Sequence, residues 1–206
     1  MTDGHKSSVQ GFVLAGGQSR RMGSDKAFLT VQGKTFLERV AGALSQVTDS
    51  LSVVGATTTD DSLGFSSIQD VVPNWGALGG VHAALSSCTA DWALIVACDF
   101  PFVTRELFEH LLAIRDSYEA VAPLQEDLIP QPLCTSYRVI PCLERSNELI
   151  KSGERKPIAL LQSVSTRWVS FDEVAGLTGS SHFFDNINSR EDYARITREG
   201  VDLSTT

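Results

Sequence analysis

The sequence has few cysteines, and none is placed as a metal site or a disulfide scaffold requires. Cys88, Cys98, Cys134 and Cys142 form no C-x-x-C pair, and four cysteines in 206 residues is far from a disulfide-dense composition. The four histidines are scattered, without an H-E-x-x-H motif or a His/Cys cluster. These absences argue against a zinc centre and against a disulfide-stapled secreted domain.

Long apolar segments and an excess of basic residues are also missing. No apolar region of signal-peptide length follows the amino terminus, and the longest apolar run, Trp92–Cys98, has the length of a buried strand. The 17 Lys and Arg against 25 Asp and Glu give a net charge of −8, which disfavours non-specific binding to nucleic acid or anionic lipid. We therefore expect a cytoplasmic protein with no nucleic-acid partner and no membrane partner.

What the sequence does contain is an alternation of strand and helix patterns. Short apolar runs predict buried strands at residues 11–15, 51–54, 92–98 and 120–123. Helical patterns lie at residues 36–47, 78–85, 105–116 and 139–152, and another begins after Ser189. This alternation predicts one three-layer α/β/α, Rossmann-like domain with a mostly parallel sheet, spanning residues 11–200 between flexible ends at 1–10 and 201–206. Ligands of such sheets bind in the loops after the strands.

The loop after the first predicted strand is rich in glycine and cations. It reads Leu14-Ala15-Gly16-Gly17-Gln18-Ser19-Arg20-Arg21-Met22-Gly23-Ser24-Asp25-Lys26. Glycines let backbone N–H groups face an anion, and Arg and Lys neutralise its oxygens. Neither G-x-x-x-x-G-K-[ST] nor G-x-G-x-x-G fits this loop. A glycine turn with solvated basic residues is the alternative, but so many cations in an acidic protein favour a phosphate-binding loop.

Two later segments carry a carboxylate next to a strand or helix end. Asp70 precedes Gly76-Ala77-Leu78-Gly79-Gly80, whose small residues open a helix and would admit a nucleotide closely; the alternative is a plain glycine turn. Asp99 follows the apolar run Trp92–Cys98. A carboxylate at the tip of a buried strand must be paired, capped or bound to a metal, so Asp99 either binds a cation or caps the turn before Thr104.

These segments together resemble one protein family. Leu14–Lys26 matches L-A-G-G-x-S-x-R-M-G-x-D-K, the signature loop of the molybdenum cofactor guanylyltransferases, and Cys98–Pro101 matches their C-D-x-P motif. The resemblance implies a nucleotidyltransferase with the nucleotide-diphospho-sugar transferase fold. Three further segments are similar to family segments on the acceptor side: Gln131-Pro132-Leu133, Gly153-Glu154-Arg155-Lys156 and Asn186-Ile187-Asn188.

The resemblance also assigns roles to residues on the nucleotide side. Arg21 and Lys26 would hold the phosphates of GTP, and Asp70 would contact the guanine or the ribose. Gly55 stands where the family has an asparagine that helps to bind the base, so only a backbone contact is expected there. The remaining residues of the implied nucleotide site are Leu14, Ala15, Gly16, Gly17 and Gly79.

The metal and the acceptor are assigned in the same way. Asp99 would be the Mg²⁺ ligand, and Asn188 a second, neutral one. Arg155 and Lys156 would bind the phosphate of the acceptor, and Asn186 would lie nearby. The residues expected to act in catalysis are therefore Arg21, Lys26 and Asp99, with Mg²⁺ as the cofactor.

The activity implied by the resemblance is transfer of GMP from GTP to the terminal phosphate of molybdopterin, with release of pyrophosphate. A phosphate monoester is largely dianionic at pH 7, so this attack needs no general base. Molybdoenzymes or other cofactor-biosynthesis proteins would be further partners. Two alternatives stay open: a related enzyme that uses CTP or UTP on another phosphorylated acceptor, and a non-catalytic carrier of GTP and molybdopterin.

Overall fold

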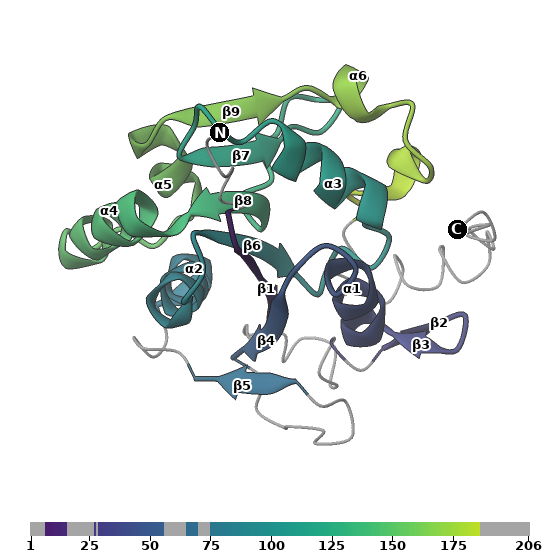
Figure 1. The fold of residues 1–206 in the computed structure, drawn as a ribbon, viewed down its shortest axis with the longest axis horizontal. Coiled ribbons are helices and arrows are strands. Elements are labelled where there is room, and N and C mark those ends of the chain that lie inside the picture. Colours follow the sequence, from purple (N-terminus) through teal and green to yellow (C-terminus); the bar gives the residue numbers. More distant parts are fainter. Residues whose placement is uncertain (1–6, 16–26, 28, 56–64, 70–74, 186–206) are drawn as a thin grey trace, which may run out of the picture.

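A seven-stranded sheet forms the centre of the protein in a computed structural model, which describes residues 7–15, 27, 29–55, 65–69 and 75–185 (Figure 1). The strands follow the order β5-β4-β1-β6-β8-β7-β9 across the sheet. Their bounds are β1 Val9–Leu14, β4 Ser50–Val54, β5 Ser66–Ile68, β6 Trp92–Ala97, β7 Ala120–Pro123, β8 Cys134–Arg138 and β9 Thr166–Val169.

The sheet is mostly parallel. β5, β4, β1 and β6 are parallel neighbours, whereas β8 runs antiparallel to both β6 and β7. β9 is parallel to β7. β1, β4, β5 and β6 therefore end at one edge of the sheet, which we call the carboxyl edge.

Helices cover both faces of the sheet (Figure 1). α1 (Phe36–Leu44) and α3 (Arg105–Ala113) lie on one face, and α2 (Gly76–Ser87), α4 (Val139–Lys151) and α5 (Ile158–Ser163) on the other. Successive strand residues point to opposite faces, so Phe12 packs under α2 while Val13 packs under α1. The short helix α6 (Phe171–Val174), the 3₁₀ turn η4 (Ser180–His182) and the hairpin β2 (Thr30–Val31) and β3 (Lys34–Thr35) complete the described elements.

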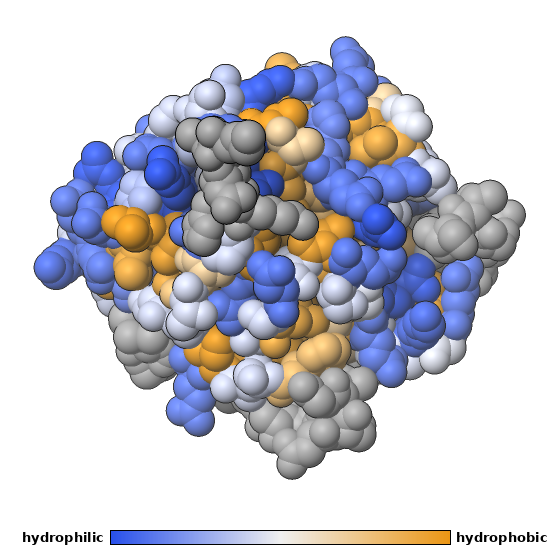
Figure 2. Space-filling view, in the orientation of Figure 1, coloured by the Kyte–Doolittle hydropathy of each residue, from blue (hydrophilic) through white to orange (hydrophobic). Residues whose placement is uncertain are grey.

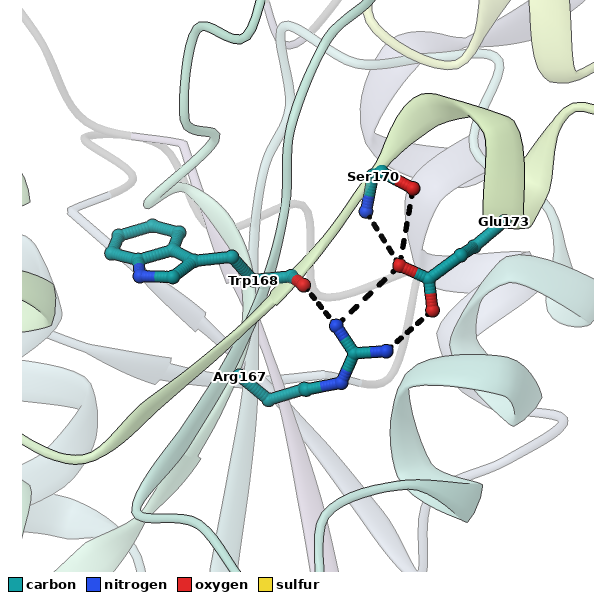
Figure 3. Close-up of polar contacts among 4 residues, drawn as sticks. All are labelled: Arg167, Trp168, Ser170 and Glu173. Carbon is teal, nitrogen blue, oxygen red and sulfur yellow. Dashed lines mark hydrogen bonds and ion pairs between the residues drawn. The ribbon is translucent and has the colours of Figure 1, made fainter.

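Side-chain caps fix where several helices begin. The Thr35 hydroxyl accepts the Glu38 N–H (3.1 Å), and the Glu38 carboxylate accepts the Thr35 N–H (2.6 Å), which forms a capping box at α1. Figure 3 shows the start of α6, where the Glu173 carboxylate accepts the Ser170 N–H (2.9 Å) and also pairs with Arg167 (2.5 Å). These hydrogen bonds and Arg167 lower the pKa of Glu173, with the Ser170 N–H as the largest cause.

The predicted three-layer α/β fold is confirmed, and its predicted strands and helices are found within a few residues of their expected ends. The prediction missed the strands β2, β3, β5, β8 and β9 and the short helices α5 and α6. β8 escaped because its sequence, CTSYR, is polar, although Thr135 and Ser136 in it are fully buried. The helix predicted after Ser189, residues 1–6 and residues 201–206 lie outside the described residues. Val9 and Gln10, which were expected in the flexible amino-terminal segment, are the first residues of β1.

The surface is mixed in polarity. Figure 2 shows hydrophilic residues over much of the viewed face, with apolar residues in separate areas between them. Within the described residues, no helix is long and apolar enough to cross a membrane.

Candidate active site

Backbone pairing continues one residue beyond the ends of the central strands. The Cys98 N–H donates to the Leu14 carbonyl (3.1 Å), and the Ala15 N–H donates to the Val54 carbonyl (2.9 Å). The Gly55 N–H donates to the Ile68 carbonyl in the same way (2.9 Å). The first residues after β1, β4 and β6 are thus held side by side at the carboxyl edge, where parallel α/β sheets bind their ligands.

Asp99 lies at this edge, two residues after the end of β6, and is partly exposed. Backbone hydrogen bonds hold its turn, because the Phe100 N–H donates to the Ala97 carbonyl (3.3 Å). The Cys98 thiol donates to the Asp99 carboxylate at 3.8 Å. The carboxylate thus lies at the carboxyl edge with part of its surface exposed.

The carboxylate of Asp99 is a donor of the kind that Mg²⁺ takes from proteins. Among the described residues, no group of three or more His, Cys, Asp and Glu side chains could hold a metal ion. Mg²⁺ differs from zinc in that it needs only one or two protein carboxylates and takes its other ligands from phosphates and water. A single carboxylate at the edge where a nucleotide would lie is therefore an adequate protein contribution for Mg²⁺.

The backbone conformation at Gly55 favours glycine at this position. Its φ is +76°, in the left-handed region that glycine adopts freely and that asparagine tolerates better than other residues. This explains in backbone terms how glycine can occupy a position where the resembling family has asparagine. It also means that Gly55 offers a ligand only its backbone.

The start of α2 lies against the end of β1. A Cβ placed on Gly80 would lie 3.6 Å from the Leu14 Cδ1 atom, and Gly79 beside it is buried. No side chain caps α2 at its N-cap residue, Trp75. The structure thus places the predicted glycine segment Gly76–Gly80 beside the end of β1, the strand after which the predicted phosphate-binding loop begins.

Arg155, which is distant in sequence, also lies beside the start of α2. It lies in the loop between α4 and α5, and its guanidinium carbon is 4.8 Å from the centroid of the Trp75 ring. Among the described residues its guanidinium has no hydrogen bond or ion pair. Other arginines are engaged within the protein: Arg105 pairs with Glu109, and Arg167 with Glu173. Arg155 is therefore a cation available to an anionic ligand.

A hollow of about 720 Å³ lies elsewhere, between α1 and α3. Its arginines are already used by the protein, because Arg39 donates to the Pro101 carbonyl (3.0 Å) and Arg105 pairs with Glu109. Burial without a carboxylate partner lowers the pKa of Arg39. We place the active site at the carboxyl edge because its glycines, Asp99 and Arg155 are the groups suited to a nucleotide.

Several predicted site residues lie outside the described part of the chain. These are Gly16, Gly17, Arg21, Lys26, Asp70, Asn186 and Asn188. The described ones, Leu14, Ala15, Gly55, Gly79, Asp99 and Arg155, belong to the carboxyl edge or to the loop packed against the start of α2. The sequence analysis gave no role to Trp75 or Glu154, because no motif links two residues that meet only in the folded protein.

The class of protein follows from the fold and this edge: the chain has the fold of nucleotidyltransferases. A crystal structure of 2-C-methyl-D-erythritol 4-phosphate cytidylyltransferase from Thermus thermophilus is similar with a TM-score of 0.71 over 92% of this chain and 97% of that one, at 16% identity. A crystal structure of molybdopterin-guanine dinucleotide biosynthesis protein A from Archaeoglobus fulgidus has a TM-score of 0.77 and 25% identity, over 93% of this chain and 98% of that one.

The particular family is shown by sequence. Residues 11–166 match the model of the MobA-like NTP transferase domain, and the chain belongs to that family. A probable molybdenum cofactor guanylyltransferase from Pelotomaculum thermopropionicum is 32% identical over 92% of this chain and 93% of that protein. The molybdenum cofactor guanylyltransferase from Desulfosudis oleivorans is 32% identical over 90% of this chain and 92% of that protein. The predicted family resemblance is thereby confirmed.

Proposed function

We propose that this chain transfers GMP from GTP to the terminal phosphate of molybdopterin and releases pyrophosphate. The observation that carries the proposal is the meeting of Leu14, Asp99 and the start of α2 at one edge, with Arg155 held beside that helix. Family membership and relatives named as molybdenum cofactor guanylyltransferases support the choice of substrates.

The chemistry asks the protein to bring two anions together. The acceptor phosphate is largely dianionic at neutral pH, so it attacks the α-phosphorus of GTP without a general base, and the bond to pyrophosphate breaks. Small residues at the start of α2 let the nucleotide approach the backbone closely. Arg155 would hold the acceptor phosphate, and Lys156 next to it is also exposed. Arg21 and Lys26, outside the described residues, are proposed for the phosphates of GTP.

Mg²⁺ is proposed as the cofactor of this reaction. Asp99 would hold it, with Asn188 as a neutral second ligand from outside the described residues. When bound, the ion would offset the negative charge that builds up on the phosphate oxygens. The protein's own part is to keep the Asp99 carboxylate at the tip of β6, which the backbone hydrogen bonds of that turn do.

The reaction is proposed to take place in the cytoplasm. All four cysteines are free thiols, and Cys98, Cys134 and Cys142 are buried. Burial raises the pKa of Cys134 and of Cys142 to about 12, so both stay protonated and unreactive. Molybdoenzymes or other proteins of cofactor biosynthesis are proposed as the partners that take the product.

Pyrophosphate release tests the proposal. The purified protein is incubated with GTP, CTP, UTP or ATP, each with and without molybdopterin, in the presence of Mg²⁺. We expect release only when GTP and molybdopterin are both present. Equal turnover with CTP would overturn the guanylyl assignment, while tight GTP binding without any release would favour a carrier.

A further inference from the structure

Trp75 contacts one loop through both its polar edge and its face. The indole Nε1–H donates to the Glu154 carbonyl oxygen at 2.7 Å, and the Arg155 guanidinium carbon lies 4.8 Å from the ring centroid. Trp75 immediately precedes α2, whereas Glu154 and Arg155 lie in the loop between α4 and α5. Trp75 and Glu154 are 79 residues apart in the sequence. One side chain thus fastens the acceptor-side loop to the start of α2.

The loop itself is ordered by Glu154. Its carboxylate accepts the backbone N–H groups of Arg155 (2.8 Å) and Lys156 (2.9 Å). These two hydrogen bonds lower the pKa of Glu154, and the bond from the Lys156 N–H is the larger cause. Glu154 therefore stays ionised near neutral pH. The backbone on both sides of the Arg155 side chain is therefore fixed, although the side chain is exposed.

The loop backbone also lies against the first residue of α2. A Cβ on Gly76 would be 4.0 Å from the Arg155 carbonyl oxygen, and Gly76 has φ of +73°. Space is adequate there, so the need for glycine is conformational. The left-handed Gly76 turns the chain from Trp75 into the helix, which keeps the Trp75 ring next to Arg155.

The cation–π contact leaves the arginine able to bind an anion. The contact is made to the face of the ring, which accepts no conventional hydrogen bond, and a guanidinium carries five N–H donors. Within the described part of the chain, no carboxylate pairs with this guanidinium. A phosphate monoester would therefore meet an arginine whose position the ring contact restricts and whose N–H donors no described residue occupies.

We propose that Trp75 is a positioning residue that holds Arg155 beside the start of α2, so that the acceptor phosphate is bound next to the nucleotide. The proposal rests on the proposed function, which supplies the acceptor. Without the ring, Arg155 would sample many side-chain conformations on an exposed loop, and binding would have to order it. Loss of Trp75 should therefore weaken acceptor binding rather than GTP binding.

Steady-state kinetics test whether Trp75 acts on acceptor binding through Arg155. The variants are Trp75→Phe, Trp75→Leu, Arg155→Ala and the double variant Trp75→Leu/Arg155→Ala. We expect Trp75→Leu to raise the KM for molybdopterin about tenfold, with the KM for GTP changed less than about twofold. Trp75→Phe keeps a ring and should have a smaller effect. The double variant should resemble Arg155→Ala, because Trp75 acts through that arginine. Trp168→Phe, on β9, is the matched control, and thermal melting by circular dichroism checks each fold.

An arginine-selective NMR spectrum tests the geometry independently of activity. A stacked Arg155 should show a ring-current shift of its Nε–H signal, which Trp75→Leu abolishes and Trp168→Phe retains. If the wild type releases no pyrophosphate with molybdopterin, the proposed function fails while this spectrum still decides the position of Arg155. An unshifted signal in the wild type, or multiplicative effects of the two substitutions on the KM for molybdopterin, would overturn the proposal.

Discussion

Replacement of Asp99 by asparagine removes a negative charge from the carboxyl edge and changes little else. Asparagine has nearly the same shape, and the turn keeps its backbone hydrogen bonds, including that from Phe100 to Ala97. Asp99 is only partly buried, so the free energy of unfolding should change by no more than about 1 kcal/mol. If Asp99 holds the Mg²⁺ ion that offsets the charge of the reacting phosphates, loss of this preorganised electrostatic group should cost ~10²–10³ in kcat, which corresponds to about 2.7–4 kcal/mol.

The assay is pyrophosphate release from GTP and molybdopterin over a range of Mg²⁺ concentrations. Asp116→Asn is the matched control, because it removes the same charge from an exposed position between α3 and β7, away from the carboxyl edge. We expect the control to keep wild-type kcat and Asp99→Asn to lose it even at high Mg²⁺. Wild-type activity of Asp99→Asn at saturating Mg²⁺ would refute the role of Asp99, and an equal loss in the control would point to a general charge effect.

Three further predictions concern the phosphate loop, the acceptor and pH. Lys26→Ala should raise the KM for GTP by at least about tenfold, because a charge-assisted phosphate contact is worth roughly 1.5–3 kcal/mol; unchanged kinetics would make Lys26 a surface lysine. Neutralising Arg155 and Lys156 together should impair molybdopterin binding while calorimetry shows GTP binding intact, and lost GTP binding would contradict this division. Burial lowers the pKa of His82 in the folded protein below its ordinary value of 6.5. The free energy of unfolding should therefore fall as the pH drops below 6.5 towards the folded pKa. Denaturant titrations should show a smaller fall for His82→Gln, and equal falls in both proteins would show that His82 does not cause this pH dependence.

The structure explains the expected behaviour of His82. It is 6% exposed, between α2 and α4, and its Nδ1 lies 3.0 Å from the Ser146 hydroxyl oxygen. That hydroxyl donates to the Leu143 carbonyl (2.9 Å), so it accepts a hydrogen bond from His82 Nδ1–H. Ser86 lies 3.4 Å from the other ring nitrogen and can donate to it. Both nitrogens are thus satisfied with the ring neutral, and protonation would add a charge to a buried site.

Local sequence patterns determined the layered fold and part of the site. Apolar runs as short as Ala120–Pro123 predicted strands, because a strand covered by helices on both faces must be apolar throughout. The helical pattern predicted at residues 105–116 begins where α3 begins, directly after Thr104, whose hydroxyl accepts the Leu107 N–H (3.5 Å). Asp99 stood out because a carboxylate at the end of an apolar strand needs a partner. Each of these signals depends on residues that are neighbours in the chain.

Only the tertiary structure decided which distant segments meet. The polar strand β8 could not be recognised from its own residues, because its burial comes from its place between β6 and β7 and from α3 and α4, which cover the two faces of the sheet there. Trp75 and Arg155 carry no shared motif, and their contact depends on how α2 packs beside α4, the helix that leads into the Arg155 loop. Local patterns report the conformation of a segment, whereas such contacts arise from long-range packing that no short stretch of sequence contains.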